Sequence, residues 1–253
     1  HRSPLNLRES IQHSCNAYYG NVFRNIIDLT GKPWEGFKIW RDHVMSFGLG
    51  TKFNTDLPIE YSGHVPTIAF YDKRYGEHRW KSLMIISMAI GQGELGTTPL
   101  QLANMTAALA NRGYYYPPHL VKAIDGRPIE SQFIEKHNTT IDRKYFDPVI
   151  DGMAMVFEQG GTGYRSRHDS IVMCGKTGTA QNPHGEDHSI FICFAPKDNP
   201  KIALAVFVEN AGGGSKFAAP IASLLVEKYL FDSISRPQLE LPILEANLIK
   251  PEE

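Results

Sequence analysis

The segment Ile171–Ala180 constrains the fold and function of this chain more than any other. A short apolar run leads into Cys174-Gly175-Lys176-Thr177-Gly178-Thr179. Such a run, followed by a lysine, two threonines and two glycines, predicts an edge strand that brings a cation and hydroxyl groups to the rim of a cleft. Gly178 has no Cβ that would block the close approach of a backbone. The segment therefore indicates a site for an anionic ligand.

The same residues also resemble the end of a nucleotide-binding P-loop. That motif needs a glycine five positions before its Gly-Lys-Thr and a helix directly after it. Here the first position is Ser170, and the breakers of Gln181–Gly185 are followed by a second apolar run, Ile190–Phe194. Strand, turn and strand are the wrong context for a phosphate cradle. The remaining alternative at this stage is an ordinary hairpin with a surface lysine.

Composition excludes several classes of protein. The 253 residues fit one large domain or a domain with an appendage. Their 42% hydrophobic and 21% charged content is that of a globular chain with a real core. A net charge of -1 provides no basic surface, so we predict no nucleic-acid partner. No apolar run approaches the roughly 18 residues of a membrane span, and no signal peptide is visible.

Neither a metal nor another cofactor is predicted. The three cysteines, Cys15, Cys174 and Cys193, form no disulfide framework and no zinc pattern. Cys174 and Cys193 fall in neighbouring predicted strands, where small buried thiols are expected. A metal cluster in one loop is the alternative, but ligands usually come from separated positions with defined spacing. Its members would be His184, Glu186, Asp187 and His188.

The N-terminal two thirds of the chain has mainly helical patterns. Apolar spacing predicts helix over Leu5–Ile27, interrupted at Ser14-Cys15-Asn16. Lys32–Pro66, rich in glycine, proline and aromatics, is expected to be irregular with short helices, and Lys81–Ile90 to be helical. Thr98 is the expected N-cap of a helix that begins at Pro99.

The C-terminal part is predicted to be a sheet covered by a helix. After a helix from Asp147 to Gly160 come three strands: one that ends at Cys174, then Ile190–Phe194, then Ile202–Val208. The last is almost wholly apolar, so it is expected in the middle of the sheet or covered on both faces. A glycine turn at 212–214 is expected to pass near the ligand or to be simply flexible. A helix over 218–230 should pack back onto the sheet.

The predicted fold class is therefore mixed α/β (α+β), with a helical portion at 1–160 and a sheet portion at 161–234. The tail at 235–253 contains Pro237, Pro242 and Pro251 and is expected to be extended.

Longer motifs give the chain a family resemblance. Ser14-Cys15-Asn16 fits a Ser-x-Asn motif, and Lys176-Thr177-Gly178 fits a Lys-Thr-Gly motif in the expected order. The longer signatures resemble class B penicillin-binding proteins, and particularly the penicillin-binding protein 2 branch: Phe47–Gly50, Asp56–Pro58, Ile90–Leu95, Thr98–Ala103, Gly161-Thr162, Gly175–Gly185, Asp187–Ser189, Val208–Gly214 and Ala218–Ala222. The resemblance covers nearly the whole chain and implies the transpeptidase, or serine β-lactamase-like, fold.

The resemblance implies a peptidoglycan D,D-transpeptidase that crosslinks stem peptides during cell-wall elongation and is a target of β-lactams. A serine would attack the D-alanyl-D-alanine bond and pass the acyl group to an amine. Ser14, Asn16 and Lys176 would be catalytic, and Thr177, Gly178 and Thr179 would bind substrate. The alternatives are a helix-terminus cap for Ser14 and a local turn residue for Asn16.

One departure from the family pattern is serious. The family nucleophile is the serine of Ser-x-x-Lys, and no serine here has a lysine three residues later. Because the chain opens at His1-Arg2-Ser3-Pro4, directly before a helical pattern, we interpret it as the C-terminal part of a transpeptidase domain whose nucleophile lies upstream. The alternatives are an inactive homologue that serves as a scaffold or binding module, and a β-lactam-hydrolysing enzyme, for which no deacylating base is evident.

The resemblance also implies partners and a location. The partners would be D-alanyl-D-alanine stem peptides, β-lactam antibiotics, and a membrane glycan polymerase with other proteins of the elongation complex. The protein would lie at the periplasmic face of the cytoplasmic (inner) membrane, anchored by an N-terminal helix absent from this chain.

Overall fold

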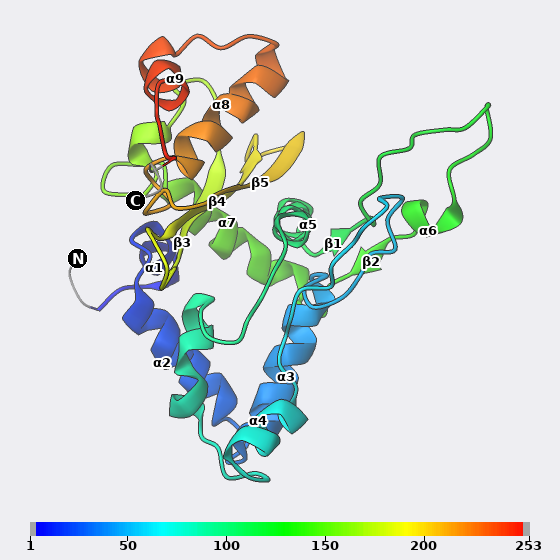
Figure 1. The fold of residues 1–253 in the computed structure, drawn as a ribbon, viewed down its shortest axis with the longest axis vertical. Helices are drawn as coiled ribbons and strands as arrows, with labels where there is room; N and C mark the ends of the chain where they lie inside the picture. The colour runs from blue at the N-terminus through cyan, green and yellow to red at the C-terminus, as the bar shows by residue number, and fades with distance from the viewer. Residues whose placement is uncertain (1–3, 250–253) are drawn as a thin grey trace. The chain divides into compact units, whose positions relative to one another are not determined.

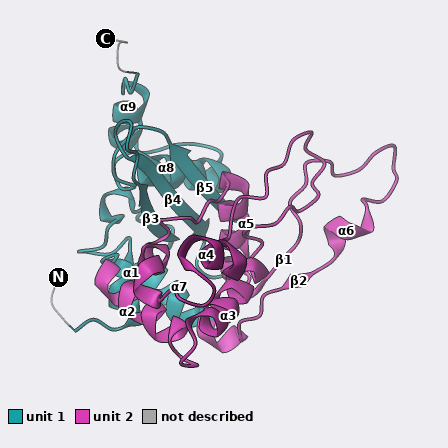
Figure 2. Cartoon of the chain, turned by 60° about the horizontal axis from the view of Figure 1, so that its bottom comes forward, with its two compact units in different colours: residues 1–14, 146–253 teal, residues 15–145 magenta. Residues whose placement is uncertain are grey.

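The computed structural model describes residues 4–249. It contains two compact units, residues 1–14 with 146–253 and residues 15–145 (Figure 2). Among the residues described, no helix is long and apolar enough to cross a membrane. The sequence-based division at residues 160 and 234 stays a prediction.

The first unit is an antiparallel sheet with helices packed on it (Figure 1). Its strands pair in the order β3-β4-β5. Helix α8 packs on β4 and β5, α7 on β3, and α1 on α7. This confirms the predicted α/β arrangement with a returning helix. The elements are α1 (Leu7–Gln12), α7 (Phe146–Met155), η3 (Tyr164–Ser166), β3 (Cys174–Ala180), β4 (His188–Ala195), β5 (Ile202–Val208), α8 (Ala218–Phe231) and α9 (Pro237–Leu244).

The bounds of the first strand correct the sequence analysis. Strand β3 begins at Cys174, where the predicted strand was to end. It is an edge strand, as predicted. The whole Lys-Thr-Gly-Thr segment pairs with β4, from Lys176 opposite Ile192 to Thr179 opposite Ser189. Hydrogen bonds to β4 therefore override the weak strand propensity of its glycines.

Strand β5 has the predicted bounds but not the predicted place. In the sheet of the described residues it forms the second edge, and most of its side chains are only half-buried. Apolar content alone cannot tell whether a strand has one neighbour or two. Helix α7 likewise ends at Met155, before the predicted Gly160, because the next residues form a turn.

The tail is not extended as predicted, because α9 occupies Pro237–Leu244. Pro237 stands in the first turn, where a missing N–H costs nothing, and the helix packs against α8. The packing of α9 against α8 thus outweighs the cost of Pro242, which stands inside the helix and cannot donate a backbone hydrogen bond. Pro251 lies outside the described residues.

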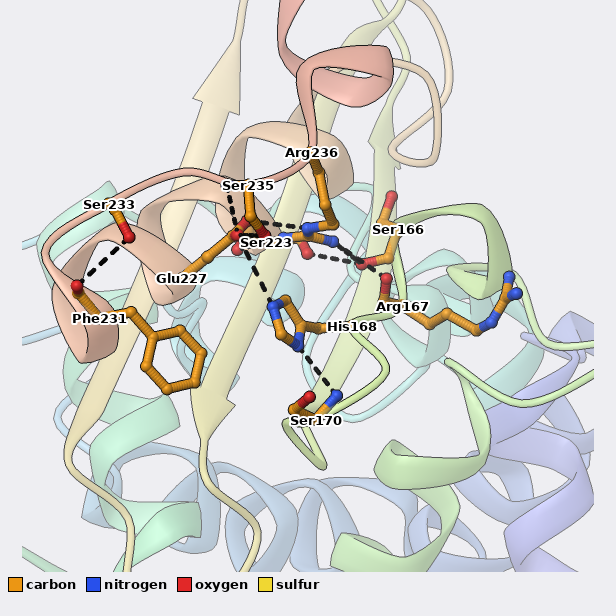
Figure 3. A network of polar contacts seen from close by, with 10 residues as sticks. All are labelled: Ser166, Arg167, His168, Ser170, Ser223, Glu227, Phe231, Ser233, Ser235 and Arg236. Atoms are coloured by element: carbon orange, nitrogen blue, oxygen red, sulfur yellow. Dashed lines mark hydrogen bonds and ion pairs between the residues drawn. The ribbon is translucent and has the colours of Figure 1, made fainter.

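A buried carboxylate fixes the start of α9 (Figure 3). The Glu227 side chain on α8 is 1% exposed and accepts from Arg236 Nε at 2.8 Å. The backbone N–H and hydroxyl of Ser235 donate to it at 2.7 and 2.6 Å, and His168 Nε2 lies 3.7 Å away. Burial opposes its ionisation, but the bonds from Ser235 and Arg236 prevail and lower the pKa of Glu227 to about 2.

The same guanidinium group holds the η3 turn. Arg236 Nη1 donates to the carbonyl of Arg167 at 3.0 Å, and Nη2 to that of Ser223 at 3.1 Å. The Ser223 hydroxyl donates to the carbonyl of Ser166 at 2.5 Å. We call Glu227, Arg236 and Ser223 the α8 clamp, since together they join α8, the start of α9 and η3.

The second unit is mainly helical around an aromatic core. Phe37, Tyr71 and Trp80 are fully buried there, and Trp34 stacks on His78. Thr98 is the N-cap of α5, as predicted, and the structure adds a reciprocal capping box with Gln101. The elements are α2 (Asn16–Ile27), α3 (Pro33–Ser46), α4 (Ile68–Tyr75), η1 (Ser82–Ile90), α5 (Pro99–Ala110), β1 (Tyr114–Tyr115), α6 (Ser131–Ile134), β2 (His137–Asn138) and η2 (Arg143–Tyr145).

The region predicted as irregular contains one long helix. Helix α3 has 14 residues, with Pro33 in its first turn. Phe37 and Trp40, three apart on one face, pack against each other and into the core, which stabilises a helix that composition argued against. Helix α4 was not predicted at all. The segment predicted as helical near 81–90 is a 3-10 helix, broken at Ile85.

Replacement of Glu227 tests the α8 clamp. The variant Glu227→Gln keeps the shape but removes the charge opposite Arg236, so the free energy of unfolding at neutral pH should fall by about 3 kcal/mol. A fall in pH should lower the free energy of unfolding less in the variant than in the wild type. The wild-type contribution is complete above the ordinary pKa of 4.5 and is lost as pH falls toward about 2. Denaturant unfolding of the wild type and the variant between pH 7 and pH 2 measures the free energy of unfolding and its pH dependence. Parallel pH profiles of the two proteins would contradict the role assigned to Glu227.

Candidate active site

The structure brings together Ser14 and Lys176, which are 162 positions apart in the chain. Strand β3 presents Lys176, and its Nζ donates to Ser14 Oγ at 2.6 Å and to the carbonyl of Thr177 at 2.9 Å. Ser14 lies between the end of α1 and the start of α2 with φ of 53°. A left-handed serine is uncommon and concentrates at functional sites. The pair joins the N-terminal segment to the edge of the sheet.

Burial changes the acidity of this lysine. Its amine is withdrawn from water, and this desolvation lowers the pKa of Lys176 from 10.5 to about 8. No carboxylate among residues 4–249 forms an ion pair with it. The amine can therefore attract an anion and can also exchange a proton near neutral pH, through a hydroxyl that both donates and accepts.

The two threonine hydroxyls of the motif lie on one face of β3, because side chains alternate along a strand. The Thr177 hydroxyl donates to that of Thr162 at 3.0 Å. Thr179 Oγ1 accepts from the backbone N–H of Gly214 at 3.3 Å. Two separate turns thus hold the two hydroxyls in place.

Gly178 and Gly214 are in close backbone contact. A Cβ on Gly214 would lie 2.3 Å from the carbonyl oxygens of Gly178 and Ile190. A Cβ on Gly178 would instead meet Cβ of Ile190 at 3.2 Å, so the close approach predicted at Gly178 itself stays a prediction. The 212–214 turn lies against the motif, and the Ser189 hydroxyl bonds the carbonyl of Gly213 at 3.0 Å, which restrains it.

Sequence reasoning gave no role to the turn at 159–162, beyond noting Gly161-Thr162 as a family signature. The structure attaches this turn to the end of α1. Thr162 N–H donates to the carbonyl of Gln12 at 3.2 Å, Gln12 Nε2 donates to that of Gln159 at 3.3 Å, and His13 Nδ1 lies 3.2 Å from that of Gly160. The signal in the sequence was the run Gly160-Gly161-Thr162, which permits such close packing.

The remaining candidates have plain structural settings. Asn16 is the first residue of α2, in the second unit, and its side chain is exposed. Cys15 is the N-cap of that helix, so Ser14 does not cap it. The catalytic and substrate-binding roles of the six named residues stay predictions.

The loop with four potential ligands does not converge on a metal. Among the described residues, no group of three or more His, Cys, Asp or Glu side chains is placed to hold a metal ion. His188 Nδ1 instead accepts from the backbone of Asn210 at 3.1 Å. The three cysteines are free and buried, as expected. Burial, with the neighbouring Cys174, raises the pKa of the Cys193 thiol.

Comparison with known proteins places these features in a family. The model of the penicillin-binding protein transpeptidase domain matches residues 1–227. The chain therefore belongs to the penicillin-binding protein transpeptidase family, as its motifs predict. A curated relative, the peptidoglycan D,D-transpeptidase MrdA of Haemophilus influenzae, is 33% identical and aligns with 92% of this chain. The chain spans only 37% of the length of that relative.

Solved structures confirm the fold. Pseudomonas aeruginosa PBP2, in complex with WCK 5153, matches with a TM-score of 0.79 at 32% identity, over 90% of this chain and 48% of that one. Helicobacter pylori PBP2, in complex with MreC, matches with a TM-score of 0.71 at 29% identity, over 89% of this chain and 40% of that one. The predicted membership of the PBP2-type transpeptidases and the α/β class are thereby confirmed.

The acidity of Lys176 can be measured directly on this chain. We expect its Nζ to titrate near pH 8, since the buried amine meets only neutral oxygens. NMR titration of the chain with labelled lysine, assigned with Lys176→Arg, gives the pKa. A Lys176 pKa at the ordinary value of 10.5 would contradict the desolvation of its amine.

Two adjacent glycines test the backbone contact at the motif. Gly214→Ala places a methyl against two carbonyl oxygens, so the free energy of unfolding should fall by about 2 kcal/mol or more, and the amide signals of residues 177–179 should shift. Gly213→Ala is the matched control, because its Cβ would meet only Thr179 Oγ1, at 3.8 Å. Equal effects of both substitutions on thermal unfolding and amide shifts would disprove the close contact.

Proposed function

We propose that this chain carries the Lys-Thr-Gly and Ser-x-Asn parts of a serine-type peptidoglycan D,D-transpeptidase active site. The single observation that carries the proposal is the bond between Lys176 and Ser14, which unites the two family motifs at the edge of the sheet. The nucleophile is a Ser-x-x-Lys serine outside residues 1–253, in the full-length protein that contains this chain.

Each residue has a defined task in this proposal. The serine attacks the D-alanyl-D-alanine peptide carbonyl, an acyl-enzyme forms, and D-alanine leaves. Ser14, bonded to Lys176, relays a proton to the leaving nitrogen. The hydroxyls of Thr177 and Thr179 bind the terminal carboxylate, and the nearby ammonium of Lys176 favours that anion. Asn16 binds the substrate backbone, and Gly178, which has no Cβ, lets the substrate approach the backbone of the strand closely.

The relatives support the proposed setting. The names of the matched proteins include a peptidoglycan D,D-transpeptidase and a PBP2 bound to MreC. We therefore propose stem peptides as substrates, β-lactams as covalent inhibitors, and a membrane glycan polymerase and elongation proteins as partners. The site of action would be the periplasmic face of the inner membrane.

Two alternatives make different predictions. A scaffold of the same fold would show no acylation in the folded full-length protein. A β-lactam-hydrolysing enzyme would be acylated but would then release hydrolysed β-lactam at a useful rate, which needs a deacylating base beside the ester.

Penicillin labelling tests the proposed function. The full-length protein should gain the mass of one penicillin, and Lys176→Ala should slow this acylation by about 100-fold or more, because a charge beside the reacting centre is lost. The isolated chain should form no adduct. Lys201→Ala, at an exposed lysine outside the site, is the control and should react normally. Intact-mass kinetics give the rates.

Two results would refute the assignment. Normal acylation of the Lys176→Ala protein would remove this lysine from the site. A stoichiometric adduct on the isolated chain would show that the nucleophile lies within residues 1–253.

A further inference from the structure

The second unit contains a cavity of about 230 Å³ beside the small β1–β2 sheet (Figure 1). Its lining includes the turn at 51–54, Tyr115 on β1 and His137 on β2. None of the six residues proposed for catalysis and substrate binding lines it. The cavity is therefore separate from the proposed transpeptidase site.

One side of the cavity is aromatic. Tyr115 and His137 are opposite each other across the two strands, and their rings stack with centroids 5.3 Å apart and planes 16° apart. Phe53 meets the Tyr115 ring edge-on, with centroids 5.9 Å apart. We call these three rings the aromatic wall. Such a wall offers a carbon surface against which the C–H groups of a ligand can pack.

Protein contacts hold the neighbouring turn in place without a ligand. The two carboxylate oxygens of Glu60 accept from the backbone N–H groups of Phe53 and Thr55. Gln101, which is 1% exposed, donates from its carboxamide to the carbonyl of Thr51 at 2.8 Å. A preformed cavity needs little ordering when a ligand binds, so even a small ligand can be held.

The phenol of Tyr115 has no hydrogen-bond partner among residues 4–249, although the residue is only 7% exposed. Within the described part of the chain, the Ser166 hydroxyl is the one unpaired side-chain group that is also sealed from solvent. The phenol oxygen is thus open to solvent, and the cavity is the space that Tyr115 lines. Burial raises the pKa of Tyr115, which keeps this hydroxyl protonated and able to donate.

Polar groups of both kinds complete the lining. Lys52 can donate, Glu135 can accept, and the carboxamide of Asn54 can do both. Within the described residues neither Lys52 nor Glu135 forms an ion pair. One cation and one anion leave the lining without net charge when His137 is neutral. Donors and acceptors around a carbon surface, without net charge, suit an uncharged ring with several hydroxyls better than an ion.

We propose that this cavity binds one pyranose ring of a neutral saccharide. In a β-glucoside the hydrogens on the first, third and fifth carbons share one face, and this face packs against the aromatic wall. One ring hydroxyl accepts from the Tyr115 phenol, and others bond to Lys52, Asn54 and Glu135. The volume of about 230 Å³ is that of roughly eight waters at ~30 Å³ each, which is close to the size of one sugar ring. The inference goes beyond the proposed function and does not depend on it.

Saturation-transfer NMR of the full-length protein tests the binding. The probes are the methyl β-glycosides of glucose and of N-acetylglucosamine, with glycine as a small zwitterionic competitor. We expect saturable signals from at least one glycoside, strongest at the hydrogens of the first, third and fifth carbons, and no displacement by glycine. Folded protein without a saturable glycoside signal would overturn the inference, and so would displacement of the glycoside by glycine.

Two neighbouring tyrosines assign the binding to the cavity. Tyr115→Phe keeps the ring but removes the hydroxyl, so the glycoside should bind about tenfold more weakly. Thermal unfolding of this variant should match the wild type, because the lost hydroxyl has no partner in the free protein. Tyr114→Phe is the matched control and should bind as the wild type, since Tyr114 lies outside the cavity lining with Lys136 Nζ 3.9 Å from its ring centroid.

Equal glycoside affinity of the Tyr115→Phe and wild-type proteins would overturn the assignment to this cavity. Penicillin acylation uses none of the lining residues, so such a failure would leave the proposed function standing.

Discussion

The site in this chain depends on one hydrogen bond, that from the Lys176 ammonium to the Ser14 hydroxyl at 2.6 Å. Withdrawing a lysine from water is costly without partners, and among residues 4–249 its hydrogen bonds go to two neutral oxygens. The cost is visible as a pKa of about 8. Ser14 itself has a left-handed conformation at the end of α1, where its backbone N–H donates to the carbonyl of Ile11 at 3.2 Å. A reactive amine and a hydroxyl are thus positioned before any substrate arrives.

Supporting contacts extend outward from this pair. Thr162 and Gly214 fix the hydroxyls of Thr177 and Thr179 from two different turns. The first of these turns is attached to α1, and η3, which follows it, is held to α8 by the bond from Ser223 to Ser166. The α8 clamp therefore restrains η3. Stability of the C-terminal helices and geometry of the site are linked through these bonds.

Local rules predicted the features that depend on neighbouring residues. The N-cap at Thr98, the bounds of strand β5 and the edge position of β3 follow from residue types and spacing. The family motifs named Ser14 and Lys176 as catalytic residues, but their hydrogen bond to each other appears only in the structure. Long-range packing decided the rest: α3 forms because Phe37 and Trp40 enter an aromatic core, and α9 because Arg236 finds a buried carboxylate. The contact of Thr162 with Thr177 could not be predicted without the fold, and the turn at 212–214 could be expected near the site only as one of two alternatives.

The most direct test of the account is a crystal structure of the full-length protein after acylation by a penicillin. The account predicts that the penicillin carboxylate lies within hydrogen-bond distance of the Thr177 and Thr179 hydroxyls. It also predicts that Lys176 Nζ stays bonded to Ser14 Oγ. An acylated serine far from Lys176, or a carboxylate held by other residues, would contradict the assignment of this site.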